Sequence, residues 1–467
     1  MTVTFTREFM LERMFAGDAA FDGLFYTGVT STGIYCLPSC RARKPLAGNV
    51  VFHPCAASAR AAGLRACRRC QPDAFQAGVP VEEATFTAAL ARLDVPGVPS
   101  VQALARALNL SGSALHRLFR EQFQSSPADW LTRRRVELAA ARLLTSADTA
   151  AQVAFAVGFG SLSAFGAQFR RVMHLTPQAL RAAIRTGTLR LTLPAAYPLE
   201  LVRRDLGRDP LSVTGQVREG AVQYAWTLPG GPQVVTVAFR DQGASVRPSH
   251  PEALRGEDWL ALHTLTVRAL GLRGLSRPVP LVPDLFDGLV WAVVGQQVTF
   301  RQACTVRWRL VERCGLPAGD GLSAPPTAQA VAALTPAELG SLGLTGARAA
   351  LLRRLAGRVS RGEVNLAALA RGTVGAARRT LLAVPGIGPW TAEYVLLRVL
   401  GFPDIVPDTD AALAAALRRA HGLPARPTPS EVQRLLAPFA PHRSHAVLRL
   451  WHALPPAMIH EPHGDTP

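Results

Sequence analysis

Lysine is almost absent from this chain: Lys44 is the only lysine among 467 residues, and the other 50 basic residues are arginines. This scarcity excludes chemistry that needs a lysine nucleophile anywhere except near residue 44. Long apolar runs are also missing, because no stretch of about 18 uninterrupted apolar residues occurs, and a membrane span needs one. The first 15 residues mix charged and apolar side chains and lack the apolar core of a signal peptide. We therefore expect a cytoplasmic protein with no membrane partner.

Acidic residues are also scarce relative to basic ones. The chain has 51 Lys+Arg and 33 Asp+Glu, a formal net charge of +18 at pH 7. An excess of this size indicates a polyanionic partner, above all nucleic acid, although an arginine-rich codon supply would also produce it. Hydrophobic residues make up 48% of the chain and charged residues 18%, so it can bury real cores. The length suggests roughly three domains.

The sequence pattern divides the chain into segments. Residues 1–80 are rich in glycine and cysteine, and the sequence Gly-Val-Pro at 78–80 suits a linker. Residues 81–187 carry Ala, Leu and Arg at spacings of three and four, which predicts helices. Residues 188–467 start with the alternation typical of strands and return to helical patterns from about residue 252. The expected fold class is therefore α+β with several domains.

Five of the seven cysteines fall between Cys36 and Cys70. In a reducing compartment, clustered cysteines indicate metal ligands or catalytic thiols before disulfides. The pairs Cys36/Cys40 and Cys67/Cys70, with 26 residues between them, suit one tetrahedral Zn²⁺ ion with four cysteine ligands. A module this small also needs such a staple, because its own core is thin. On spacing alone a purely structural zinc site is favoured, and Cys55 is a spare thiol nearby.

The residues around these cysteines carry a family resemblance. The stretches Thr32–Arg43, Asn49–Phe52 and Ala62–Asp73 closely resemble the N-terminal domain of the Ada family of bacterial adaptive-response proteins, over about residues 5–75. The resemblance implies that a zinc-bound cysteine, Cys36 by its position, takes the methyl group from a methyl phosphotriester in DNA. It also implies that nearby basic residues hold the DNA backbone, although each of them could simply belong to a solvated face. These basic residues are Arg41, Arg43, Lys44, Arg65, Arg68 and Arg69.

Formal charge explains how methylation of Cys36 would act as a signal. Zinc keeps the sulfur in the thiolate form, which is the nucleophilic one. Four thiolates around one divalent ion leave two net negative charges, and methylation turns one thiolate into a neutral thioether. The repulsion between this site and the DNA phosphates would then weaken. We therefore expect the affinity for DNA to rise once the methyl group is transferred.

Two helix-turn-helix patterns follow in residues 81–187. Val101–Leu108 and Ala114–Arg120 flank a turn in which Ser111 is the expected N-cap of the second helix. Ala150–Gly158 and Leu162–Arg171 form a looser second copy. Many helical hairpins with such patterns serve only as packing units. The pattern by itself therefore leaves DNA binding open.

A second resemblance favours DNA binding by this module. Leu115–Phe119, Gly158–Phe165 and Leu175–Arg181 resemble AraC-type regulators over about residues 83–185. The resemblance implies an all-α domain whose two recognition helices enter adjacent major grooves of promoter DNA. The side chains expected to contact bases or phosphates are Ser113, His116 and Arg117 in the first helix and Ser161, Ser163 and Gln168 in the second.

A glycine-containing turn marks the C-terminal part. In Val384–Ala392, Gly386 and Gly388 precede a predicted helix, and backbone amides there can hold a DNA phosphate. Asp410 follows Gly388 by 22 residues. Together these features resemble the helix-hairpin-helix DNA glycosylases, whose catalytic aspartate lies at such a distance from the hairpin.

Two further motifs narrow the resemblance to the AlkA branch, which acts on alkylated bases. They are Gly295–Thr299, with the sequence Gly-Gln-Gln-Val-Thr, and His442–Ala446, with the sequence His-Arg-Ser-His-Ala. The resemblance covers about residues 188–455 and implies a β-rich subdomain at 188–273 followed by an all-α glycosylase domain at 274–467. An aromatic residue is usual near position 442, so His442 leaves the preference for particular bases open.

The resemblance also assigns roles to individual residues. The nucleotide is flipped out of the stack, and a carboxylate then stabilises the oxocarbenium-like sugar and guides water. Asp410 is the expected carboxylate, and the spacing argues against its neighbour Asp408. Trp390 and Tyr394 would stack on the cationic base, although packing within the helix explains them equally well. The DNA contacts expected near the flipped nucleotide are Gln296, Gln297, Gly386 and Gly388, with Gln297 filling the emptied stack.

Absences decide the type of glycosylase. Lyases of this superfamily carry a lysine two residues after the last hairpin glycine, where this chain has Trp390. No C-terminal four-cysteine pattern for an iron–sulfur cluster exists. The Pro-Cys-His-Arg site of Ada proteins for guanine alkyl groups is missing as well, because Pro441–Arg443 lacks the cysteine. We therefore expect a monofunctional DNA-3-methyladenine glycosylase II that leaves an abasic site.

The complete interpretation is a fusion of an Ada-like zinc domain, an AraC-type double helix-turn-helix domain and an AlkA-like glycosylase. Its expected partners are double-stranded DNA, both alkylated and promoter, and RNA polymerase. Two alternatives stay open: a DNA-binding regulator whose glycosylase half is inactive, and a glycosylase whose N-terminal modules only add DNA affinity.

Overall fold

The computed structural model describes residues 5–76, 100–108, 110–195, 197–240, 243–273 and 278–454. The chain forms two compact units, the first made of Met1–Val95 with Pro99–Leu115 and the second of Pro96–Val98 with His116–Pro467. The linker expected at residues 78–80 lies outside the described residues. Within the described residues, no helix is both long and apolar enough to cross a membrane.

The first unit contains a small sheet with the strand order β3-β1-β2-β4. β1 pairs antiparallel with β2 and β3, whereas β2 and β4 run parallel. The core beneath the sheet is thin and includes the cysteines together with Tyr26, Tyr35 and Leu37. The elements are α1 (Arg7–Ala16), β1 (Tyr26–Val29), β2 (Ile34–Cys36), β3 (Val50–His53), α2 (Ala56–Ala61), β4 (Arg65–Ala66) and α3 (Pro72–Gln76).

Helices dominate from residue 100 to residue 186. Ser111 accepts a hydrogen bond from the Ala114 amide at 3.2 Å, so the expected N-cap is confirmed. Ser161 caps the later helix in the same way, accepting from Ala164 at 3.1 Å. The helices are α5 (Val101–Leu108), α6 (Gly112–Phe123), α7 (Pro127–Thr145), α8 (Ala150–Ala156), α9 (Leu162–Met173) and α10 (Pro177–Thr186).

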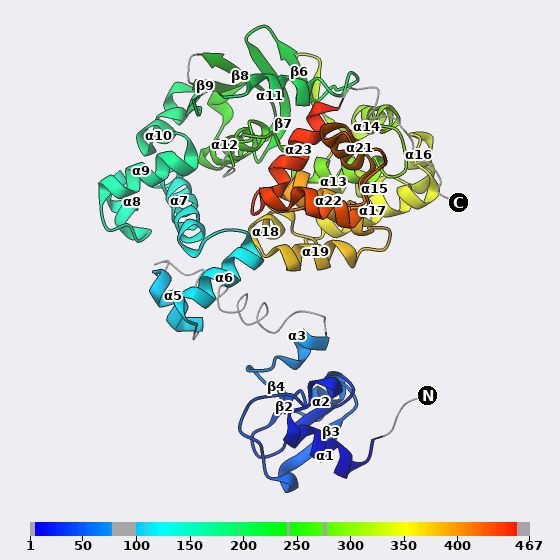
Figure 1. The fold of residues 1–467 in the computed structure, drawn as a ribbon. Coiled ribbons are helices and arrows are strands. Elements are labelled where there is room, and N and C mark those ends of the chain that lie inside the picture. Colours follow the sequence, from blue (N-terminus) through cyan, green and yellow to red (C-terminus); the bar gives the residue numbers. More distant parts are fainter. Residues whose placement is uncertain are drawn as a thin grey trace. The chain divides into compact units, whose positions relative to one another are not determined.

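A five-stranded antiparallel sheet follows, with the order β5-β9-β8-β7-β6. β5 and β9 alternate buried and less buried side chains, as the sequence pattern predicts, whereas β7 and β8 each contain three consecutive buried residues. In Figure 1 these green strands group at one side of the second unit, together with α12. The elements are β5 (Leu189–Thr192), α11 (Leu199–Leu206), β6 (Gly215–Arg218), β7 (Ala221–Leu228), β8 (Gly231–Arg240), β9 (Gly243–Pro248) and α12 (Gly256–Ala269).

One hydrophobic core joins the helix-turn-helix segment to this sheet. It runs from Val136 on α7 to Leu272 after α12, and α12 packs against α7 and α10. Polar contacts reinforce the junction, since His263 Nε2 lies 2.8 Å from the Met173 carbonyl oxygen. Burial lowers the pKa of His263 to about 4, so its ring is neutral at pH 7 and Nε2 carries the proton that it donates. The core therefore crosses the boundary expected near residue 187.

This shared core predicts the behaviour of fragments. A fragment of residues 188–467 would expose Trp259 and Leu262 of α12, both fully buried in the intact chain. Exposing each such side chain costs about 2–3 kcal/mol, so this fragment should be insoluble or lack a cooperative thermal transition. A fragment of residues 125–467 keeps α7–α10 and should stay soluble and unfold cooperatively. Equal melting curves for the two fragments, followed by circular dichroism, would contradict a shared core.

The remaining helices surround a second core that reaches from Val279 to Leu448. In Figure 1, the yellow-to-red helices form this part beside the green sheet. The elements are α13 (Leu285–Val294), α14 (Phe300–Cys314), β10 (Leu316–Gly319), β11 (Leu322–Ala324), α15 (Ala328–Ala333), α16 (Pro336–Ser341), α17 (Gly346–Ser360), α18 (Leu366–Arg371), α19 (Val374–Leu382), α20 (Pro389–Tyr394), the π-helix η4 (Val395–Leu400), α21 (Ala411–His421), α22 (Pro429–Leu436) and α23 (Arg443–Ala453).

Candidate functional site: a cysteine cluster and a buried aspartate

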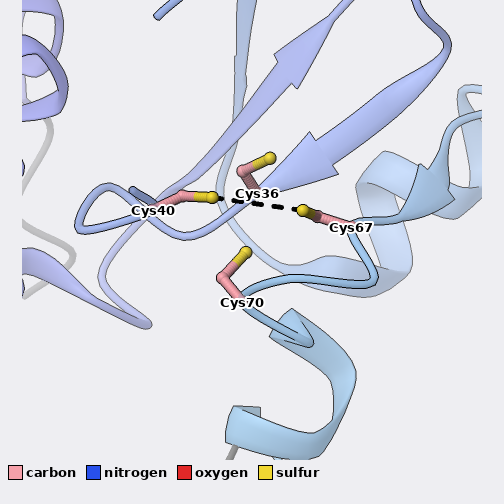
Figure 2. A group of neighbouring side chains, drawn as sticks. All are labelled: Cys36, Cys40, Cys67 and Cys70. Carbon is pink, nitrogen blue, oxygen red and sulfur yellow. Dashed lines mark hydrogen bonds between the residues drawn. The ribbon is translucent and has the colours of Figure 1, made fainter. Parts of the chain in front are cut away.

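The four expected metal ligands meet in one cluster. The sulfur atoms of Cys36, Cys40, Cys67 and Cys70 all lie within 4.8 Å of one another, and those of Cys40 and Cys67 are 4.0 Å apart. Figure 2 shows the four side chains converging, with Cys36 at the end of β2 and the others on the loops beside it. β2 and β4 are parallel, with Tyr35 beside Ala66, so Cys36 and Cys67 come together where these strands end. Tetrahedral zinc with four thiolates needs sulfur atoms about 3.8 Å apart, so the cluster fits one Zn²⁺ ion.

The four cysteines are not equivalent. Cys36 is partly exposed, whereas Cys40, Cys67 and Cys70 are buried. The Leu37 amide donates to Cys70 Sγ and the Arg69 amide to Cys67 Sγ, both at 3.4 Å. Within the described part of the chain, no backbone N–H donates to Cys36 Sγ. Such hydrogen bonds withdraw charge from sulfur, so Cys36 is both the most accessible thiolate and one of the less stabilised.

Cys55, the spare thiol, lies outside this cluster. It is the N-cap of α2, and its sulfur accepts from the Ser58 amide at 3.4 Å. Tyr35 lies in the same small core as the cysteines, and its hydroxyl donates to Asp73. Burial and a hydrogen bond to Asp73 raise the pKa of Tyr35 to about 12, so the hydroxyl stays a donor. Arg60 NH1 reaches the same carboxylate at 2.6 Å.

The basic residues around the cluster divide into two groups. Lys44 is half-buried, and its ammonium group donates to the carbonyl oxygens of Met14, Pro38 and Cys40. The only lysine therefore clamps the loop that carries two of the cysteines, a role that the sequence did not indicate. The other five of the six basic residues expected to hold the DNA backbone are exposed: Arg41, Arg43, Arg65, Arg68 and Arg69.

The residues expected to contact DNA in the two helix-turn-helix segments are almost all exposed. Leu115 and Phe119 are buried residues of α6, and Phe165 and Phe169 are buried residues of α9. The Ser161 hydroxyl is already engaged as the cap of α9. The exposed residues are Ser113, His116, Arg117, Ser161 and Ser163, and Gln168 is half-buried.

Gln296 and Gln297 take different positions. Gln296 Nε2 donates to the Gly386 carbonyl oxygen at 3.2 Å and to Thr391 Oγ1 at 2.9 Å, so this side chain braces the hairpin between α19 and α20. Gln297 is exposed, with a left-handed φ of 51°. Gly386 has a φ of 97°, a conformation that side chains disfavour, and Gly388 caps α20.

Asp410 is 7% exposed and lies at the N-cap of α21. Its Oδ1 accepts from the Leu413 amide at 2.6 Å and from Trp451 Nε1 at 2.9 Å. Its Oδ2 accepts from Trp390 Nε1 at 2.8 Å. Three N–H donors from three helices or their ends thus hold this carboxylate in one orientation. Asp408 instead receives a hydrogen bond from Gln433 Nε2 at 2.8 Å, and in the described part of the chain neither indole N–H donates to it.

Aromatic rings surround Asp410. Trp390 and Tyr394 stack with centroids 5.6 Å apart, and Tyr394 lies 6.2 Å from Trp451. Trp451 on α23 is a residue that sequence reasoning missed. Trp451 lies six residues after His445, the end of the Arg-Ser-His motif. Nothing in the local sequence pattern distinguishes it from a tryptophan that only packs in the core. His442 is exposed just before α23 begins.

Comparisons with known proteins agree with this geometry. Three family models match: the metal binding domain of Ada at residues 10–73, a helix-turn-helix domain at 104–183 and the HhH-GPD superfamily of base excision DNA repair proteins at 290–441. The 3-methyladenine DNA glycosylase from Archaeoglobus fulgidus shares the fold, with 22% identity and a TM-score of 0.50 over 56% of this chain and 96% of that one.

Two relatives match different shares of the chain. The bifunctional transcriptional activator/DNA repair enzyme Ada of Escherichia coli is 38% identical over 120 residues, which is 26% of this chain and 33% of that protein. The probable bifunctional transcriptional activator/DNA repair enzyme AlkA of Mycobacterium tuberculosis is 33% identical over 479 residues, which is 94% of each chain.

Fold and site together define a base-excision DNA repair protein of the helix-hairpin-helix class, joined to a zinc-binding domain and a helix-turn-helix domain. The chain belongs to the family of bifunctional transcriptional activator and DNA repair enzymes named AlkA. The expected α+β multidomain fold, the four-cysteine zinc site and DNA as partner are confirmed.

Proposed function

We propose that the C-terminal part is a monofunctional DNA-3-methyladenine glycosylase II that hydrolyses the N-glycosidic bond of alkylated purines such as 3-methyladenine and 7-methylguanine. The observation that carries this proposal is the buried Asp410 carboxylate, held by the indole N–H groups of Trp390 and Trp451. The proposed domains are residues 1–80, 81–187, 188–273 and 274–467, and the second and third share one hydrophobic core.

The chemistry needs little from the protein beyond placement and charge. An alkylated purine is a cationic leaving group, so its glycosidic bond is already weakened. As this bond breaks, positive charge develops on the sugar, and a fixed carboxylate stabilises it without having to reorient. Among the described residues, Asp410 Oδ2 accepts from Trp390 alone and keeps acceptor capacity for the water that attacks. Trp390 and Tyr394 offer electron-rich faces to the flipped base.

Cys36 is the proposed methyl acceptor. Zn²⁺, held by Cys36, Cys40, Cys67 and Cys70, would keep the sulfur ionised at neutral pH. The Cys36 thiolate attacks the methyl carbon of the phosphotriester, the carbon–oxygen bond breaks and a phosphodiester anion leaves. The exposure of Cys36 and its lack of an N–H donor among the described residues support this choice. The exposed arginines Arg43 and Arg65 would hold the DNA backbone.

Methyl transfer would turn the chain into a transcription activator. Loss of one negative charge at the cluster should strengthen DNA binding, and the helix-turn-helix segment would then read a promoter through His116, Arg117, Ser161 and Ser163. RNA polymerase is the partner that an activator requires.

Two assays test this function. Alkylated duplex DNA should release free methylated purines and keep an intact strand until alkali cleaves the abasic sites. A regulator with an inactive glycosylase half would release none. A glycosylase whose N-terminal modules only add affinity would release bases, but its promoter affinity would not change after exposure to methyl-phosphotriester DNA.

The Trp451→Phe variant should release bases more slowly, although it keeps an aromatic ring at this position. The indole N–H to Asp410 Oδ1 disappears, so the carboxylate is less firmly oriented, and the single-turnover rate of base release should fall roughly tenfold or more. The control is Trp308→Phe, since Trp308 lies on α14 with 36% exposure. Equal rates for both variants would show that the Trp451 N–H has no catalytic importance.

A further inference from the structure

An acidic residue of the β-rich subdomain contacts two helices of the glycosylase part. Asp205 Oδ1, on α11, accepts from Arg398 NH2 at 3.0 Å and from His452 Nε2 at 3.1 Å. These partners are 193 and 247 residues away in sequence. Neighbouring Arg204 reinforces the contact, since its NH1 donates to the His452 carbonyl oxygen at 3.3 Å. α11 therefore fixes both η4 and the end of α23.

Asp205 has two buried partners, Arg398 and His452, and a more exposed third, Arg208, whose NH1 lies 3.7 Å from the same oxygen. The side chains of Arg398 and His452 are 6% and 4% exposed, and that of Asp205 is 17% exposed. His452 Nδ1 lies 2.6 Å from the Leu448 carbonyl oxygen, so each ring nitrogen of His452 faces an oxygen acceptor. Burial alone would raise the pKa of Asp205, but the charges of Arg398 and His452 hold it well below its usual range.

Each of the two buried partners lies next to an aromatic residue near Asp410. Burial would lower the pKa of Arg398, but the charge of Asp205 and the nearby Tyr394 hydroxyl raise it. Arg398 follows Tyr394 by four residues, so the two side chains lie on the same side of the helix. His452 directly follows Trp451, whose indole N–H reaches Asp410. Asp205, Arg398 and Tyr394 also line one common cavity of about 120 Å³, at the junction of the sheet and the helices.

We propose that Asp205 is a positioning residue of the glycosylase, which sets Tyr394 through Arg398 and Trp451 through His452. This inference rests on the proposed function of the Asp410 site. The β-rich subdomain then does more than support the fold, because it fixes Tyr394, which would face the flipped base, and Trp451, which orients Asp410. Replacing the carboxylate by an amide would leave the buried Arg398 guanidinium without this counter-charge and would weaken the hydrogen bond to His452, so both contacts would loosen.

The test compares Asp205→Asn with Asp209→Asn in the full chain. Asp209 is a matched control because it is also buried and pairs with Arg307 at 3.7 Å, outside the contacts around Asp410. With enzyme in excess, the single-turnover rate of 7-methylguanine release reports the geometry of folded molecules, and unfolded ones do not lower it. Affinity for a duplex with a tetrahydrofuran abasic analogue is measured in parallel.

Asp205→Asn should slow base release roughly 30-fold while its DNA affinity stays within about threefold of the unchanged protein. Asp209→Asn should stay within about threefold in both. In the Asp205→Asn/Tyr394→Phe double variant, the losses of rate should be less than multiplicative, because both changes disturb the same connection from Asp205 through Arg398 to Tyr394. An unchanged rate in Asp205→Asn, an equal loss in Asp209→Asn, or fully multiplicative losses would overturn the positioning role alone. An unchanged protein that releases no base would instead refute the proposed function, and this role with it.

Discussion

The Asp410→Asn variant should lose release of methylated purines by a factor of about 10³ or more while still binding DNA. The amide has no charge to set against the oxocarbenium-like sugar. Its NH₂ group would also face the N–H of either Trp390 or Trp451, so one of the present hydrogen bonds must be lost. The measurement is single-turnover base release from alkylated duplex DNA, with affinity for an abasic analogue followed separately.

Asp408→Asn is the matched control, since Asp408 is a nearby carboxylate that bonds to Gln433 and not to the indoles. It should retain base release within about threefold. Equal activity in the two variants, or a loss confined to Asp408→Asn, would reject Asp410 as the catalytic carboxylate.

The Cys36→Ser variant should accept no methyl group from methyl-phosphotriester DNA. A serine hydroxyl is far less nucleophilic than a zinc-bound thiolate, so label transfer should fall to background. Three buried thiolates remain, and the variant can therefore retain part of its zinc. Transfer of labelled methyl groups and zinc content are measured on the same sample.

Cys55→Ser is the control for this experiment, because Cys55 caps α2 and lies outside the cluster. It should accept methyl groups like the unchanged protein. Label that still reaches the Cys36→Ser protein would assign the acceptor role to another cysteine.

Local signals in the sequence predicted much of this architecture. The spacing of the four cysteines required two short turns, and parallel pairing of β2 with β4 brings those turns together. Ser111 caps α6 because its side chain suits the free amides at a helix start. Asp410 could be chosen over Asp408 from its distance to Gly388, and only Asp410 contacts the indoles.

Long-range packing accounts for what the sequence did not reveal. Trp451 reaches Asp410 from 41 residues away, and Asp205 reaches His452 from 247 residues away. No local periodicity encodes such contacts. The shared core between α7 and α12 likewise depends on which apolar faces meet, so the change from helical to alternating pattern near residue 187 marked a change of secondary structure and not the limit of a core.

The central claim is that one chain both excises alkylated bases and records backbone methylation on Cys36. It is tested most directly by a single incubation of the full chain with duplex DNA carrying labelled methyl groups. We predict label in two products: free methylated purines, and a peptide in which Cys36 is S-methylated. Free bases with an unmodified Cys36, or a methylated Cys36 with no released base, would contradict the claim.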